Sequence, residues 1–182
     1  MRRSLLPLPL PLLLALATPL AAQEQQAADP SRVAVAAARA NWIGAHNYIV
    51  RSAEQMSEAN FAFKPVATVR SFGQIVAHVA DDEMGWCAQI LGEPLKQTEF
   101  EKKLTAKADV IKAIRDAGTY CEKAYGITDA EAATVTTIWG GQQPKIRGLM
   151  DNATHDWEHY GNIVTYLRIK GDGAALVTGA IG

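Results

Sequence analysis

The chain has 182 residues, of which 48% are hydrophobic and 20% are charged, and its formal net charge is −1. This balance is ordinary for a globular protein, and it excludes an intrinsically disordered chain, a collagen-like repeat and a disulfide-dense miniprotein.

Residues 1–22 have the composition of a secretory signal peptide. Arg2 and Arg3 precede an apolar run from Leu5 to Leu20, and small residues follow that run. The run contains four prolines and is shorter than the roughly 20 apolar residues that a membrane-spanning helix needs. We therefore expect residues 1–22 to be a cleaved leader, residues 23–30 to be a polar spacer, and the mature protein to be periplasmic or secreted.

The chain without this leader is mildly acidic. Removing the leader takes away two arginines and no acidic residue, which leaves a formal charge of −3. Such a body lacks the positive footprint of a nucleic-acid-binding protein, and it has no basic amphipathic face for a membrane surface. A small-molecule substrate or ligand is therefore the expected partner, rather than a nucleic acid or a membrane.

The first of four expected helices lies between residues 31 and 58. No proline interrupts this segment, and Val35, Trp42, Ile49 and Met56 recur at every seventh position. This period is typical of the buried stripe of a long amphipathic helix.

The second helix is expected to begin after Ser71, a candidate N-cap, and to end at Gly92 and Pro94. A polar connection over 95–106 follows it. This connection is long enough for a crossover in place of a simple turn. The third helix is expected over 106–125, and Gly126 ends it.

Residues 134–138 are β-branched, but we expect an extended loop here, because an isolated strand has nowhere to place its backbone hydrogen bonds. Pro144 favours a helix start, so the fourth helix is expected over 145–170. The small-residue tail, 171–182, is expected to be poorly ordered and flexible. Four helices with one apolar stripe each predict an all-α four-helix bundle over 31–170, with the longer connection between helices two and three.

Cys87 and Cys121 lie on different expected helices, the second and the third. An exported protein enters an oxidising compartment, where these two residues could form a disulfide. Two free thiols buried in the helices are the alternative, and the distance between them in the fold decides.

Three of the four histidines occupy positions that suit a metal site. His155 and His159 are four residues apart, so both imidazoles can face one ion. A pair of surface histidines is the alternative explanation of this spacing. A third ligand must come from another helix, and His78 is the best candidate because it lies on the inward side of the second helix. Three neutral imidazoles with open positions suit zinc, nickel or iron(II) in a reactive site.

Other side chains near this motif have competing interpretations. His46, on the stripe of the first helix, is either a core histidine bonded to backbone or a group that supports the metal site. Asp82 is either a surface acid or the acceptor for the free imidazole N–H of a ligand. Glu158 completes an H-x-x-E-H run, the motif of inverted zinc peptidases, but those enzymes are much larger, and we place Glu158 to the side of the metal. Trp139 is the best candidate for a pocket wall.

The chain resembles the DinB-like family of metal-binding four-helix bundles in three segments, which are RSFGQIVAHVAD at 70–81, HDWEHYGN at 155–162 and IVTYLR at 163–168. The resemblance covers roughly residues 33–170. It implies that the three histidines named above, His78, His155 and His159, form a triad that holds a divalent metal, with water completing the coordination.

The same resemblance implies more than one function. Some relatives in this family are transferases that use a low-molecular-weight thiol, whereas the periplasm is poor in such thiols. The expected function is therefore an exported, metal-dependent transferase or hydrolase acting on a small molecule. The alternative is a non-catalytic periplasmic metal- or ligand-binding bundle. Bundles of this type often pair through a helix face, so a homodimer is compatible with the sequence, which gives no direct sign of one.

Overall fold

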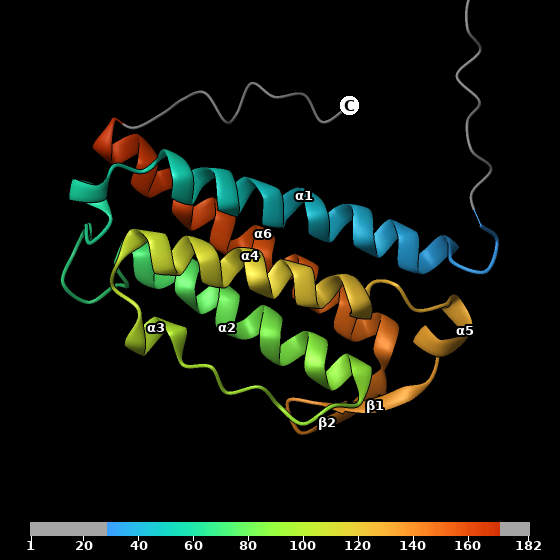
Figure 1. Cartoon of the computed structure of the whole chain (residues 1–182). Coiled ribbons are helices and arrows are strands. Elements are labelled where there is room, and N and C mark those ends of the chain that lie inside the picture. Colours follow the sequence, from blue (N-terminus) through green and yellow to red (C-terminus); the bar gives the residue numbers. More distant parts are fainter. Residues whose placement is uncertain (1–28, 172–182) are drawn as a thin grey trace, which may run out of the picture.

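Four long helices make up most of the part of the chain, residues 29–171, that this computed structural model describes (Figure 1). They are α1 (Val33–Gln55), α2 (Phe72–Leu91), α4 (Lys107–Ala124) and α6 (Lys145–Lys170). The predicted all-α bundle is thus confirmed. The predicted leader, most of the spacer and nearly all of the tail lie outside the described residues. Among the described helices, none has the length and apolarity to cross a membrane.

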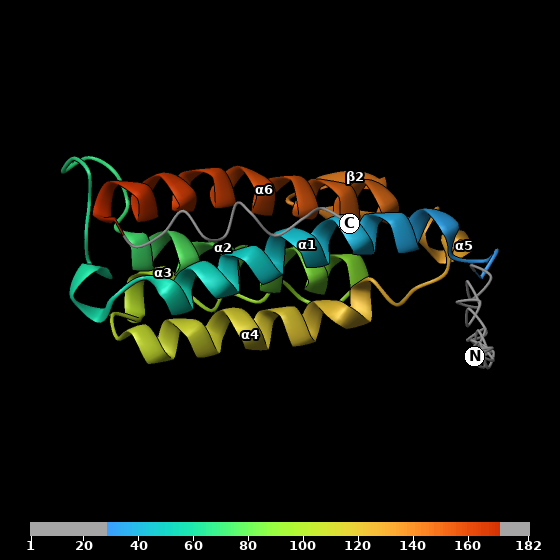
Figure 2. The ribbon, with the colours of Figure 1, turned by 90° about the horizontal axis from the view of Figure 1, so that it is seen from above.

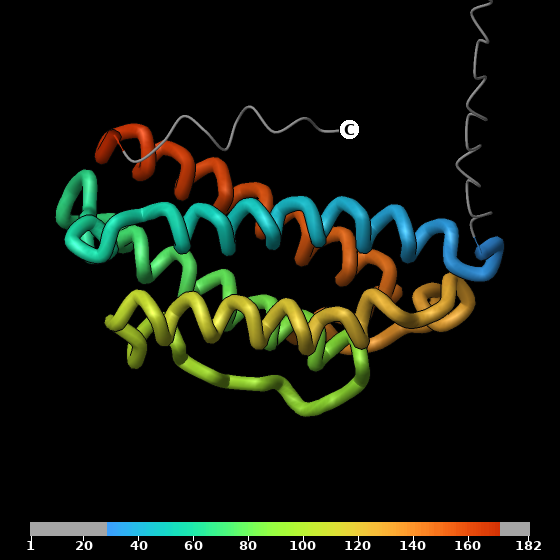
Figure 3. The backbone as a smooth tube through the Cα atoms, turned by 45° about the horizontal axis from the view of Figure 1, so that its top comes forward, coloured from blue at the N-terminus to red at the C-terminus, as the bar shows by residue number. Residues whose placement is uncertain are grey.

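The order of the helices around the bundle places α2 opposite α1. Each of these two helices packs against both α4 and α6, and Figure 2 shows α1 lying alongside α6 and α4. The colours of Figure 3 show that α1 and α6 run in one direction and that α2 and α4 run in the other. The connection between α2 and α4 must therefore run back along the bundle, so the predicted crossover is confirmed.

Three short helical turns occupy the connections: η1 (Glu58–Asn60), α3 (Phe100–Lys103) and α5 (Asp129–Ala132). The start of α2 is fixed by a capping box, in which the Ser71 side chain accepts from the Gln74 backbone N–H and the Gln74 side chain accepts from that of Ser71. This box holds the helix end that lies two turns before His78.

The expected extended loop is wrong, because residues 134–138 are largely a strand. β1 (Val135–Ile138) pairs antiparallel with β2 (Gly141–Pro144) across the two-residue turn Trp139–Gly140. The strand therefore has the hydrogen-bond partner that we took to be missing. The backbone N–H of Trp139 donates to Gln89 Oε1 at 2.7 Å, which fastens the hairpin to α2.

A disulfide joins α2 to α4 inside the bundle. Cys87 and Cys121 are both fully buried, and their Cα atoms lie 5.2 Å apart, within the usual range for a disulfide. The sequence left open whether these two cysteines are bonded or free, and the structure shows that they are bonded.

Candidate metal centre

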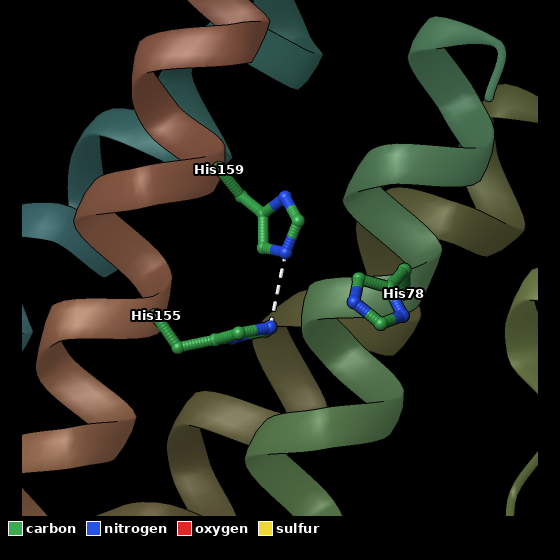
Figure 4. Close-up of side chains that lie close together, drawn as sticks. All are labelled: His78, His155 and His159. Carbon is green, nitrogen blue, oxygen red and sulfur yellow. Dashed lines mark hydrogen bonds between the residues drawn. The ribbon is translucent and has the colours of Figure 1, made fainter. Parts of the chain in front are cut away.

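The three predicted histidines face one another across the contact between α2 and α6 (Figure 4). His78 comes from the second turn of α2, whereas His155 and His159 lie one turn apart on α6. One ring nitrogen from each residue lies within 4.8 Å of the other two. All three are mostly buried, so the sequence brings three nitrogen donors to one point that is still open to a small ligand.

The donor set fits a divalent transition metal. His155 Nε2 and His159 Nε2 are 3.0 Å apart, which is close to the separation of about 3.3 Å between two nitrogens of a tetrahedral zinc site. The Nδ1 atoms of both rings are buried and have no hydrogen-bond partner among the described residues. Both rings are therefore directed through Nε2 towards the same point.

Asp82 lies at this centre and not behind a ligand. Its Oδ2 is 3.1 Å from His155 Nε2 and 3.4 Å from His78 Nε2, the same atoms that face the shared point. The sequence had offered Asp82 as a surface acid or as the acceptor of a ligand's remote N–H. The structure corrects both interpretations, because this carboxylate contacts two of the grouped imidazole nitrogens directly.

The electrostatics of the three rings are unequal. Burial, followed by the positive charges of His155 and His78, lowers the pKa of His159 to about 4. Burial is also the main cause of the lowered pKa of His78. Burial opposes the charge on His155, but Asp156 and Asp82 outweigh it and raise its pKa to about 9. The lowered pKa values of His78 and His159 favour the neutral form that a metal ligand needs, whereas His155 would lose its extra proton on binding a cation.

A second set of buried polar groups lies behind the centre. Asp156 and Glu83 are fully buried, and Asp156 Oδ1 is 3.7 Å from His155 Nδ1. Burial, and then the charge of Glu83, raises the pKa of Asp156 well above its ordinary value. Glu83 Oε1 accepts from Trp42 Nε1 at 2.8 Å and lies 2.8 Å from His46 Nδ1. These contacts connect the three clustered histidines to α1 through the interior.

His46 belongs to this interior set, which confirms that it is buried in the core but corrects the partner expected for it. It is a core histidine, but its partner is the Glu83 carboxylate and not the backbone, and it is not among the grouped ligand atoms. Burial lowers the pKa of His46, yet the charge and hydrogen bond of Glu83 outweigh burial, and the pKa is raised.

This raised pKa predicts a pH dependence. Because the folded pKa of His46 exceeds the unfolded value of about 6.5, the pair stabilises the fold fully below that value and less as the pH rises through the folded pKa. Glu83→Gln removes the charge and leaves the burial, so the His46 ring should titrate at lower pH in NMR spectra of that variant. Glu122→Gln, which removes a weaker charge, should shift it less. Unchanged titration in E83Q would contradict this origin of the shift.

Two hollows open beside the centre. One has a volume of about 470 Å³, and His78, Asp82 and Trp139 are among its lining residues. The other has a volume of about 530 Å³ and includes His159 and Arg70 in its lining. The prediction that Trp139 forms a pocket wall is confirmed.

Glu158 is exposed on α6. This exposure fits the lateral place predicted for it from the helical period.

Known proteins share both sequence features and the fold with this chain. A family model described as the DinB superfamily matches residues 42–163. A DinB-like protein from Bacillus cereus ATCC 10987 has a similar structure, with a TM-score of 0.65 and 15% identity over 74% of this chain and 91% of that one. A DinB-like protein from Bacillus subtilis has a TM-score of 0.58 and 20% identity over 76% and 94%. At these identities the two structures show the fold alone. No curated protein matches the chain.

Proposed function

The chain belongs to the DinB superfamily, and from that premise we propose that it is an exported protein that binds one divalent metal ion through His78, His155 and His159. The observation that carries the proposal is the convergence of three imidazole nitrogens within 4.8 Å of one another. Zinc, nickel and iron(II) are the ions that such a nitrogen set suits. The leader-like composition of residues 1–22 and the buried disulfide both support export, because disulfides persist in oxidising compartments.

The surroundings of the centre favour a catalytic role. When bound, the metal would act as a Lewis acid or would activate water or a thiol. The hollow lined by His78 and Asp82 gives a small molecule access to the open side of the centre. Asp82 can accept a hydrogen bond from such a molecule, because its carboxylate lines the hollow and touches the triad. Metal-dependent transfer or hydrolysis on a small molecule is therefore the reaction class proposed.

Asp82 also favours a second candidate function. Its Oδ2 lies within 3.4 Å of two ligand nitrogens, so a small movement would make it a fourth ligand. A tetrahedral zinc ion held by three imidazoles and one carboxylate has no position left for a substrate. The protein would then be a non-catalytic metal-binding bundle.

Metal loading followed by X-ray absorption spectroscopy tests the proposal and separates the two roles. The purified full chain, loaded in turn with zinc, nickel and iron(II), should bind one ion per chain with three imidazoles in its coordination sphere. Failure of all three ions to bind in this ratio would overturn the metal site. In an open site Asp82→Asn should leave the coordination number unchanged, whereas in a closed site it should remove one oxygen ligand.

A further inference from the structure

The tip of the hairpin has a side chain that the turn itself does not favour. Trp139 and Gly140 are the two central residues of the turn, with φ of 49° and 81°. Turns of this kind favour asparagine or aspartate followed by glycine, and a bulky aromatic residue with positive φ is uncommon. Trp139 is also 48% exposed. The conformation of the turn therefore does not explain why a tryptophan stands here.

The Trp139 indole nevertheless packs closely against α2. A Cβ atom at Gly85 would be 2.8 Å from Cη2 of the indole, so the absence of a side chain at Gly85 lets the ring approach the helix backbone. Trp86 packs edge-on against the same ring at 5.7 Å. With the Gln89 hydrogen bond at its backbone, Trp139 is held as a rigid wall of the hollow.

The charged side chains of this hollow have partners of their own. Asp81 accepts from the Thr98 hydroxyl and from two backbone N–H groups at the start of α3. Glu99 pairs with Lys102, and Lys96 pairs with a glutamate. The two apolar side chains of the hollow are not covered in this way, because Leu95 and Trp139 are 40% and 48% exposed. A ligand would therefore gain affinity in this hollow by covering these two apolar side chains.

The spacing along α2 sets the size of that ligand. Gly85, under the indole, follows His78 by seven residues, which corresponds to about 10 Å along a helix. His78 and Trp139 line the same hollow of about 470 Å³. We propose that Trp139 is a binding platform for a flat, apolar, aromatic group of a small-molecule ligand. The other end of this ligand binds the metal, about 10 Å away along α2. This inference rests on the metal site proposed above and adds the substrate class.

Two hydroxamates that differ only in a phenyl ring test this inference. Both butanehydroxamate and 4-phenylbutanehydroxamate bind divalent metals through the same head, and the second has a ring at the required reach. Calorimetry on the zinc-loaded full chain should show about tenfold tighter binding of the phenyl compound, from ring contact and burial. In Trp139→Asn this preference should fall to twofold or less, and Trp139→Phe should restore part of it.

The variants separate binding from folding. W139N loses the packing of the indole against Gly85 and Trp86, but asparagine suits a positive φ, so this variant should remain folded and should still bind one zinc ion. Equal affinity of both hydroxamates for the wild type, with zinc bound, would overturn the platform and leave the metal site standing. A full preference retained in W139N would likewise overturn the assignment to Trp139. Zinc that fails to bind at all would overturn the metal site and, with it, the platform.

Discussion

The His155→Ala variant is expected to bind zinc at least about 100-fold more weakly than the wild type. Structural zinc sites bind with an apparent 10–16 kcal/mol, or roughly 3 kcal/mol for each of four ligands, and loss of one such share corresponds to about two orders of magnitude. His155 Nε2 lies 3.0 Å from His159 Nε2 and 3.1 Å from Asp82 Oδ2, so its removal opens the middle of the donor set. Competition with a chromophoric chelator at constant pH measures the change.

A neighbouring variant supplies the matched control. Glu158 lies on the same helix, beside His159, but its side chain is exposed. Glu158→Gln should therefore retain wild-type zinc affinity. Wild-type affinity in H155A would contradict the triad. An equal loss in E158Q would instead indicate a general effect on α6, or the metallopeptidase-like role that its exposed position argues against.

The four helices could be predicted because their sequence pattern is strong. Apolar residues recur at helical spacing, and the capped start of α2 and the glycine that ends it are visible in the sequence. The hairpin could not be predicted in the same way. Its second strand, Gly141–Pro144, is polar and contains two glutamines, and its turn begins with a tryptophan where asparagine is usual. Contacts with α2, which no local pattern shows, hold it in place.

The acidic run Asp81–Asp82–Glu83 shows why the candidate site was only partly predictable. In sequence these three residues resemble a solvated surface patch. In the fold Asp81 binds the start of α3, Asp82 faces the three clustered histidines, and Glu83 is fully buried against His46. Successive helical residues point about 100° apart, so one run serves three environments.

A signal for the buried acids was nevertheless present. Glu83 lies seven residues after Val76, and Asp156 lies seven residues after Leu149, so both acids interrupt apolar stripes. A carboxylate on such a stripe is buried only where partners compensate for the loss of water. The seven-residue period thus indicated interior acids, whereas only the three-dimensional structure identifies Trp42 and His46 as partners of Glu83.

Loss of the Cys87–Cys121 disulfide is expected to lower the free energy of unfolding by about 4 kcal/mol. The bond closes a loop of 34 residues, and the chain-entropy relation gives about that value for a loop of this length. The bond also fixes α2 to α4 near the end of α2 that lies away from the capping box. Urea unfolding of the wild type and of a Cys87→Ala, Cys121→Ala double variant, both as the full chain without metal, measures the difference.

A reducing agent distinguishes loss of the bond from loss of packing. Reduction should destabilise the wild type towards the level of the double variant and should leave the double variant unchanged, because that variant has no thiols. Reduction should affect zinc binding less than it affects stability. His78 contacts His159 on α6, whereas the disulfide joins α2 to α4. A difference below about 1 kcal/mol between oxidised and reduced wild type would show that the packing of α2 against α4, and not the covalent link, stabilises this side of the bundle.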